Sequence, residues 1–292
     1  MPVTRPFTQR PVLLLALAGA FVLGSLLVLP QGQALASALV LFFRGQTIQA
    51  VSTDYAHLQN AYRTLEELQK LGVMQGSLPK QLTTVSSTSE ASAMVGFTVA
   101  EPATLPNSIN DTPAAVKALR PTQVTLTLSQ AVANAYFKSI GSAQTLPATY
   151  DGEQLIVSFP GIVLLEYVGA PGGKLYVGQA GQLTVEAAGS AGVDELRNYL
   201  LTLPGLSRDT AAALQSISAW QTTIPLGIPT DRAGWTAIDV DGALGGAGVV
   251  LNDNSGIGSA VLWQRHDGSQ SLGVGGWGLG ASEVQAVANS LH

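Results

Sequence analysis

The chain has 292 residues, a net charge of -5, 11% charged residues and no cysteine. The absence of cysteine excludes disulfide cross-links and thiolate chemistry, so an exported domain must rely on its hydrophobic core for stability. A slightly acidic chain with scattered basic residues also argues against nucleic-acid binding, which requires a basic patch.

An apolar run of eighteen residues, 12–29 (from Val12 to Leu29), follows a short tail that carries Arg5 and Arg10. At a rise of about 1.5 Å per residue, a helix of that length spans about 27 Å, close to the thickness of a hydrocarbon core. Basic residues that flank a membrane helix stay on the cytoplasmic side. We therefore predict a cytoplasmic tail over 1–10, a transmembrane helix or uncleaved signal anchor over 11–30, and an extracytoplasmic body. The lipid bilayer is the expected partner of 12–29.

Cleavage is the alternative for this segment. Ala34-Leu35-Ala36 has the small-x-small form of a signal-peptidase site, and Pro30 breaks the helix shortly before it. This alternative gives a protein secreted after cleavage following Ala36. The apolar core is longer than the about 7 to 15 residues of a secretory signal, which favours a retained single-pass anchor. Either outcome exports the rest of the chain.

Residues 31–75 are predicted to form a juxtamembrane segment, with an extended piece at 47–51 and an amphipathic helix at 54–71. Apolar side chains recur in this helix at three- and four-residue steps, at Tyr55, Leu58, Tyr62, Leu65 and Leu68. The stripe either packs on its own domain or pairs with a second copy as a short coiled coil. The following residues, 76–94, are rich in Ser and Thr and predict a flexible linker.

The body, 95–292, alternates runs of strands with helices. Alternating patterns and turn dipeptides predict strands at 122–128, 155–159, 162–168, 174–178, 182–187, 235–240, 248–251, 259–264 and 269–274. Helical patterns fall at 129–140, 193–203, 207–220 and near the carboxyl end, where Ser282 and Gln285 have capping-box spacing. This order predicts an α+β fold, with antiparallel sheets and helices packed on one side.

Three segments resemble one bacterial family. Residues 94–106, Met-Val-Gly-Phe-Thr-Val-Ala-Glu-Pro-Ala-Thr-Leu-Pro, resemble its "GF-x-V-x-x-P-x-x-LP" segment, and 41–46 and 259–291 are similar to its membrane-exit segment and its last hairpin and helix. The family comprises uncharacterised extracytoplasmic domains, found C-terminal to the membrane span of anti-sigma factors and in some lipoproteins. The resemblance implies an exported sensor-like or ligand-binding module without agreed catalytic residues. Anti-sigma members carry a sigma-binding domain before the span, whereas residues 1–10 are too short for one, so we expect an anti-sigma-factor-like chain that lacks it.

Candidate catalytic groups are few. The chain has three histidines, and His266 is the one inside the body, in the turn Arg265-His266-Asp267-Gly268. A serine nucleophile needs a histidine base held by an acid, and the chain has no G-x-S-x-G motif. Without cysteine or paired histidines, no tetrahedral zinc site is expected. His266 is therefore predicted to be an exposed turn residue.

Two sets of carboxylates leave alternatives open. Glu166 and Glu186 lie in strands that are expected to be neighbours in one sheet, where they form either an acid–base pair or part of a solvent face. Asp239 and Asp241, with the polar loop 252–254, form either a calcium site or ordinary turns.

Four glycines are closely spaced further along the chain, at Gly242, Gly245, Gly246 and Gly248. A phosphate-binding loop needs a helix after its glycines, whereas a predicted strand follows these. They therefore indicate a hairpin or a bulge.

The sequence thus predicts a membrane-anchored extracytoplasmic sensor or interaction domain without catalytic activity. It offers no catalytic, cofactor-binding or metal-binding residues, and an envelope protein is the expected partner. The alternative is an exported carrier or binder of an apolar, lipid-like ligand. That alternative rests on 162–165 and 248–251, which are apolar on successive residues and so on both faces of their strands. A secreted hydrolase is the third hypothesis.

Overall fold

The computed structural model describes residues 47–53, 68–76, 82–169, 172–202, 223–229, 233–253 and 258–292. The predicted membrane segment 12–29, the first fourteen residues of the predicted helix 54–71 and the predicted helix 207–220 lie outside these ranges. Within the ranges, no helix has the length and apolar character that crossing a bilayer requires.

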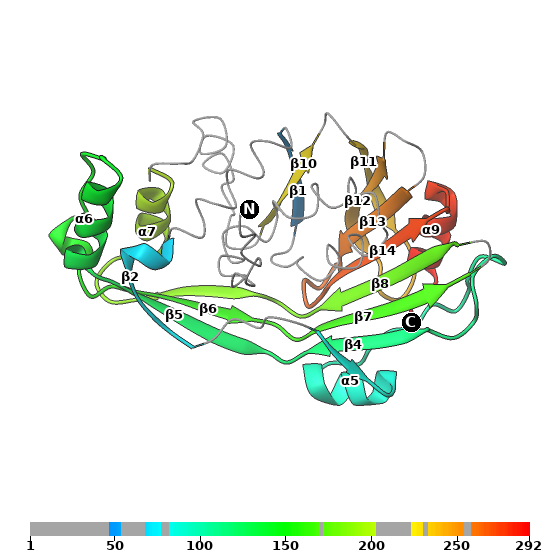
Figure 1. Ribbon diagram of the computed structural model, residues 1–292. Coiled ribbons are helices and arrows are strands. Elements are labelled where there is room, and N and C mark those ends of the chain that lie inside the picture. Colours follow the sequence, from blue (N-terminus) through cyan, green and yellow to red (C-terminus); the bar gives the residue numbers. More distant parts are fainter. Residues whose placement is uncertain are drawn as a thin grey trace, which may run out of the picture.

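The described chain is α+β, and its two larger sheets are antiparallel (Figure 1). One sheet has eight strands in the order β11-β12-β13-β14-β8-β7-β4-β3, and another has four in the order β2-β5-β6-β9. β1 and β10 form a parallel pair, which departs from the antiparallel prediction. The strands are β1 (Thr47–Thr53), β2 (Gly72–Gln75), β3 (Thr83–Val85), β4 (Ala115–Leu119), β5 (Thr122–Leu128), β6 (Gln154–Phe159), β7 (Ile162–Val168), β8 (Lys174–Ala180), β9 (Thr184–Ala188), β10 (Thr223–Pro229), β11 (Ala233–Val240), β12 (Gly246–Asp253), β13 (Gly258–Gln264) and β14 (Ser271–Trp277). The helices are η1 (Leu68–Leu71), α5 (Thr88–Val95), α6 (Gln130–Ser139), η2 (Ala148–Tyr150), α7 (Val193–Leu200) and α9 (Ala281–Asn289).

Three neighbouring lengths of chain cross from one large sheet to the other, and each is interrupted at the crossing. β4 leads into β5 through Arg120-Pro121, β6 into β7 through Pro160-Gly161, and β8 into β9 through 181–183. A proline has no N–H to donate, so it cannot continue a ladder of hydrogen bonds. The N–H of Gly181 donates to the carbonyl of Gly161 at 3.2 Å, which places two of the interruptions side by side. We call this row the strand-break line.

Side-chain alternation changes phase at the strand-break line. Phe159 of β6 and Ile162 of β7 are buried in the same core, although they are separated by an odd step of three residues. A continuous strand returns to the same face in steps of two. Odd steps into that core also separate Leu119 from Val124 and Ala180 from Leu183. The irregular residues therefore keep one hydrophobic face continuous across both sheets.

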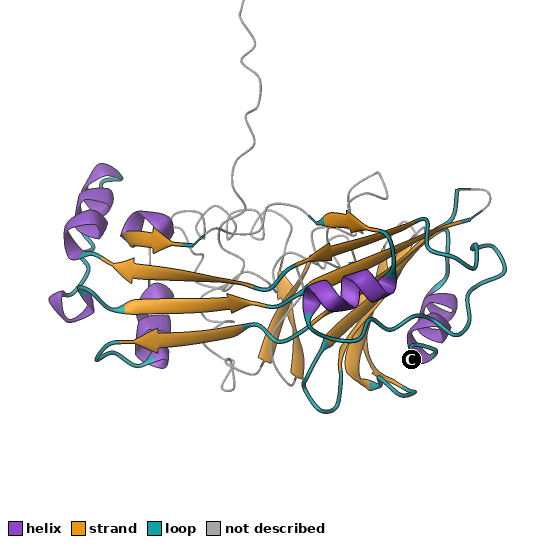
Figure 2. Cartoon of the chain, turned by 90° about the horizontal axis from the view of Figure 1, so that it is seen from below, coloured by secondary structure: helices purple, strands orange, loops and turns teal. Residues whose placement is uncertain are grey.

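Two hydrophobic cores lie on opposite faces of the eight-stranded sheet. The first core extends over both large sheets and includes side chains of α6 and α7, among them Phe137. The second core includes side chains of α5 and α9 and contains Tyr167 and Trp263. Figure 1 shows α6 and α7 above the long strands and α5 below them, and Figure 2 shows α5 lying across the lower face. The prediction of helices on one side is therefore wrong, because the layer of α5 and α9 covers the second face.

The predicted flexible linker over 76–94 is wrong for residues 82–94, which form β3 and most of α5. The hydroxyl of Ser87 caps α5 by accepting from the N–H of Glu90 at 3.1 Å, and Ala91 and Val95 are buried in the second core. The Ser- and Thr-rich composition conceals this cap and its short buried face. β2, from the predicted juxtamembrane segment, pairs with β5, so the body includes chain before residue 95.

The sequence predicts the bounds of two strands and one helix cap correctly. The strands predicted at 122–128 and 162–168 are β5 and β7 with the same bounds. The hydroxyl of Ser129 accepts from the N–H of Val132 and caps α6, as predicted. The last helix is capped differently: Gly280 precedes α9, and its N–H donates to Glu283 Oε2 at 2.9 Å, in place of the predicted Ser282 and Gln285.

Gly161 provides a test of how tightly the strand-break line packs against α5. A Cβ added at Gly161 would lie 2.5 Å from the carbonyl oxygen of Val95, so Gly161→Ala requires a backbone to move. We expect this change to lower the free energy of unfolding by about 1–3 kcal/mol. Gly234→Ala, whose Cβ meets nothing within 4 Å, is the control and should shift it by less than about 0.5 kcal/mol. Urea unfolding of the full chain, followed by tryptophan fluorescence, measures both; equal stabilities would contradict the proposed packing.

Candidate functional site

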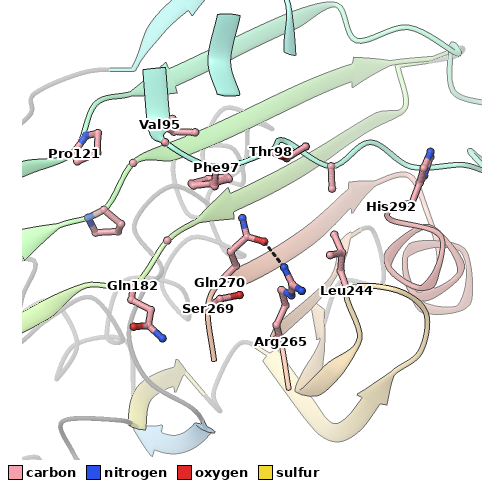
Figure 3. A pocket seen from close by; sticks show the side chains of 15 residues that line it. Val95, Phe97, Thr98, Pro121, Gln182, Leu244, Arg265, Ser269, Gln270 and His292 are labelled. Atoms are coloured by element: carbon pink, nitrogen blue, oxygen red, sulfur yellow. Dashed lines mark hydrogen bonds between the residues drawn. The ribbon is translucent and has the colours of Figure 1, made fainter. Parts of the chain in front are cut away.

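A cavity of about 540 Å³ opens beside the strand-break line, on the face that carries α5 (Figure 3). Five parts of the chain line it: the end of α5 with the loop that follows, the strand breaks, the loop between β11 and β12, the β13–β14 hairpin, and His292. Small-molecule sites occupy about 300–1,000 Å³, so this volume suits a ligand. α5 ends at the line, where Gly96 adopts a left-handed conformation with φ of 83°.

Apolar and polar side chains come largely from different walls of the cavity. The loop after α5 and two of the strand breaks contribute the apolar residues Val95, Phe97, Pro121 and Pro160. The third strand break and the hairpin contribute the polar residues Gln182, Arg265, Ser269 and Gln270. Leu244 adds an apolar side chain beside the hairpin. Such a lining suits a ligand with an apolar part and a polar end.

Gln179 holds the wall formed by the loop after α5. Its side chain is fully buried, and its amide nitrogen donates to the carbonyl of Ala100 at 2.6 Å. The N–H of Ala100 donates in return to Gln179 Oε1 at 2.8 Å. The amide thus satisfies both backbone groups of Ala100, as a neighbouring strand would. The N–H of Val99 also donates to the hydroxyl of Ser92 at 2.9 Å. These bonds fix the loop that carries Phe97.

The β11–β12 loop forms a second wall. The indole nitrogen of Trp263 donates to the carbonyl of Leu244 at 2.8 Å, which ties this loop to the second core. Gly242 has a φ of 96°, a conformation that favours glycine, and a Cβ at Gly246 would collide with the carbonyl of Gln264. β11 and β12 pair antiparallel on either side of the loop. The predicted hairpin is therefore confirmed for the glycine cluster.

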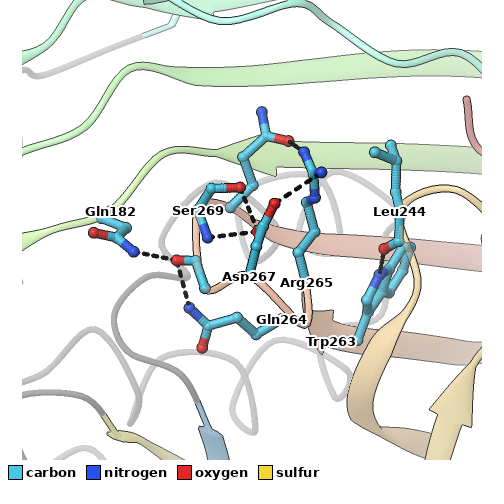
Figure 4. A network of polar contacts seen from close by, with 9 residues as sticks. Gln182, Leu244, Trp263, Gln264, Arg265, Asp267 and Ser269 are labelled. Carbon is cyan, nitrogen blue, oxygen red and sulfur yellow. Dashed lines mark hydrogen bonds and ion pairs between the residues drawn. The ribbon is translucent and has the colours of Figure 1, made fainter.

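The β13–β14 hairpin positions a guanidinium at the cavity (Figure 4). Arg265 donates from one nitrogen to Gln270 Oε1 at 3.2 Å, and its other terminal nitrogen lies 2.9 Å from Asp267 Oδ2. The hydroxyl and the N–H of Ser269 donate to Asp267 Oδ1 at 2.6 and 2.9 Å. The hydroxyl bond, followed by the backbone bond and the Arg265 charge, lowers the pKa of Asp267. Asp267 is therefore ionised at neutral pH and orients Arg265.

A shared carbonyl anchors the same hairpin to the third strand break. The amide nitrogens of Gln182 and Gln264 both donate to the carbonyl of Gly268 (Figure 4). His266 lies at the tip, exposed, with its N–H donating to the carbonyl of Gly245 at 3.1 Å. The prediction that His266 is an exposed turn residue is confirmed.

The polar side chains of the cavity are of several kinds. Among the described residues that line it, none has a carboxylate side chain. The Ser269 hydroxyl donates to Asp267, so its bond is to a carboxylate and not to a histidine base. Arg265, His292 and the amides of Gln182 and Gln270 are among the polar side chains of this lining.

The structure separates the predicted carboxylate pair. Glu166 lies on β7 of the eight-stranded sheet, whereas Glu186 lies on β9 of the four-stranded sheet. Glu166 is bound to Lys117 Nζ at 2.5 Å. Glu186 is exposed and lies opposite Ile156. The expectation that they are neighbours in one sheet is wrong, because β6–β7 and β8–β9 change sheets at the strand-break line.

The structure also separates two of the oxygen groups considered for calcium, whereas Asn254 lies outside the described residues. Asp239 is opposite Ala247 near the β11–β12 loop, whereas Asn252 is opposite Gly234 at the far end of that hairpin. Five residues of strand at about 3.3 Å each separate the two positions by about 17 Å. The calcium hypothesis therefore fails for Asp239 together with Asn252. Across the described ranges, no group of three or more His, Cys, Asp or Glu residues is arranged to hold a metal ion.

The apolar strands behind the carrier hypothesis are covered on both faces. Ile162 and Leu164 belong to the first core, and Val163 and Leu165 to the second. In β12, Val249 and Leu251 belong to the first core and Val250 to the second. None of these side chains lines the cavity. Its apolar wall comes instead from irregular segments that sequence alternation does not mark.

None of the lining residues carries a sequence motif that marks a site. Phe97 and Arg265 lie within segments that were noted for other reasons, a family resemblance and a turn. Gln179 carries one usable signal, because it is a glutamine that follows four residues of Leu, Tyr, Val and Gly, 175–178, within its strand. A polar side chain at such a position is expected to have a specific hydrogen-bond partner.

Removing the Gln179 amide should loosen the wall that carries Phe97. Gln179→Met keeps a side chain of similar length but leaves the N–H and C=O of Ala100 unpaired, which should cost about 1–3 kcal/mol of unfolding free energy. Hydrogen–deuterium exchange at residues 97–101 should become faster. The control is Gln123→Met, because the Gln123 amide donates to Ser158 at an exposed position. Unchanged exchange in Gln179→Met would contradict the assigned role.

Comparison of the chain with protein-family models, with curated proteins and with solved structures finds no match. The resemblance of residues 94–106 to extracytoplasmic domains of anti-sigma factors therefore stays a prediction.

Proposed function

We propose that this chain is a membrane-anchored extracytoplasmic sensor without catalytic activity, and that its body binds a small ligand in the cavity at the strand-break line. The apolar run 12–29 behind a basic tail supports the anchor and the direction of export. The cavity supports ligand binding, because its lining offers donors and apolar contacts.

The observation that carries this proposal is the position of the cavity at the junction of two sheets. A ligand there contacts Pro121 and Pro160 at the breaks, Phe97 in the loop after α5, and Gln270 in the β13–β14 hairpin. It therefore contacts elements of both sheets simultaneously. A ligand that prefers one relative arrangement of these elements shifts the protein toward that arrangement, which is the physical requirement for a sensor.

The second candidate function is that of an exported carrier for an apolar, lipid-like ligand. The apolar wall of Val95, Phe97 and Leu244 favours it, since these side chains would cover the body of such a ligand. A carrier and a sensor use the same cavity but differ in their partners. Crosslinking in native membranes should capture an envelope protein if the chain is a sensor, whereas a carrier should release its ligand to acceptor vesicles.

Filling the cavity should remove a co-purified ligand. Thr98 is exposed and lines the cavity, so Thr98→Trp places an indole in it without disturbing a core. Thr112 is exposed and does not line it, which makes Thr112→Trp the matched control. Native mass spectrometry of the full chain should show a bound small molecule in the wild type and in Thr112→Trp, and its loss in Thr98→Trp.

Lipids held by the membrane anchor are common to all three proteins and so do not affect that comparison. Equal adducts in all three, or a cavity-dependent adduct in none, would contradict ligand binding at this site.

The direction of export is tested with reporters fused after His292. A phosphatase that requires disulfides should be active, because disulfides form outside the reducing cytoplasm. A cytoplasmic galactosidase at the same position should be inactive. The reverse pattern would overturn the proposed topology. The intact mass of the purified chain further distinguishes a retained anchor from cleavage after Ala36.

A further inference from the structure

The guanidinium of Arg265 is the only lysine or arginine charge among the described residues that line the cavity. Its side chain is 28% exposed, and it points toward Gln270 and the interior of the cavity (Figure 3). The two hydrogen-bonding contacts to Gln270 and Asp267 occupy two of its five N–H donors. Donors therefore remain for a ligand.

We propose that the ligand is an amphipathic anion, with a carboxylate or phosphate head bound by Arg265 and an apolar body lying against Phe97. The inference rests on the proposed function, because it names the class of ligand for the same cavity.

The anionic head follows from the charges around Arg265. No Asp or Glu side chain is among the described residues that line the cavity, whereas Arg265 and His292 are, so the lining side chains favour an anion over a cation. Asp267 is paired with Arg265 but is 53% exposed, and ion pairs at exposed sites are weak. The pair therefore orients the guanidinium, and the N–H donors that Gln270 and Asp267 do not occupy can bind a second oxyanion.

Gln270 adds a neutral donor next to the guanidinium. Its side chain is buried, with the residue 7% exposed, and its Oε1 is occupied by Arg265. The oxygen and the nitrogen of an amide lie on opposite sides, so the Gln270 nitrogen is directed away from Arg265, toward Phe97 (Figure 3). This nitrogen therefore offers a second donor to a ligand oxygen on the side of the cavity that holds Phe97.

The apolar body follows from the opposite wall. Val95 and Phe97 lie across the cavity from the hairpin, and Leu244 lies beside Arg265 (Figure 3). Phe97 is half-buried against the second core, so its ring is partly available. A short alkyl chain against this wall is stabilised because its CH₂ groups are removed from water.

Octanoate and octan-1-ol test the head group, because they share a chain of eight carbons and differ in charge. Binding to the full chain in lipid nanodiscs is measured by titration calorimetry, with empty nanodiscs as the blank. We expect octanoate to bind about tenfold or more tightly than octan-1-ol. Octyl phosphate, measured alongside, distinguishes a phosphate head from a carboxylate head.

Variants of Arg265 locate the effect. Arg265→Gln should weaken octanoate binding by about tenfold and leave octan-1-ol binding unchanged. Arg265→Lys keeps the charge but not the planar set of N–H donors, so its affinity for octanoate should lie between those of the wild type and of Arg265→Gln. It also serves as the second variant if Arg265→Gln perturbs the hairpin. Lys138→Gln removes one exposed positive charge on α6 and should have no effect.

The outcomes separate this inference from the proposed function. Equal binding of octanoate and octan-1-ol, with both abolished by Thr98→Trp, would overturn the anionic head and leave the cavity as the binding site. Binding that Thr98→Trp does not change would contradict the cavity itself. Failure of both octanoate and octyl phosphate to bind would overturn the inference. The proposed function is tested separately, by the co-purified small molecule in native mass spectrometry.

Discussion

The structure depends on one constraint. In three neighbouring lengths of chain, the alternation of side chains between the two sheet faces must shift by one residue at the strand-break line. Pro121 and Pro160 interrupt the hydrogen-bond ladder there, and Gly161 allows the backbone to approach α5. The odd steps keep the first core continuous over both sheets. The cavity opens where this irregular backbone and the end of α5 coincide, so it is a consequence of how the two sheets are joined.

The elements that the sequence located are those with strong local signals. β5, β7 and α6 follow from alternation and from a serine cap, and these require no knowledge of distant residues. α5 was missed because its first turn is built from the same Ser and Thr residues that are typical of linkers. The resulting helix covers a face that had been expected to lack helices.

The candidate site was beyond sequence analysis for a different reason. Its walls meet only because residues near 97, 121, 160, 182 and 265 are brought together by long-range pairing. Alternation assigns a residue to a face but not to a sheet, which is why Glu166 and Glu186 appeared to be neighbours. The polar residues of the site are oriented by ordinary ion pairs and hydrogen bonds, such as that of Asp267 with Arg265, which form no recognisable sequence motif.

The parallel pair of β1 and β10 has a mechanical consequence. β1 begins at Thr47, on the carboxyl side of the proposed anchor, and its seven residues pair in register with β10. Tension between a membrane and the body would act along β1 and load all of these pairs together in shear, instead of opening them one after another. β1 also contacts β12 and β13, two strands of the eight-stranded sheet. Force on the tether would therefore be distributed over the sheet that carries the β13–β14 hairpin.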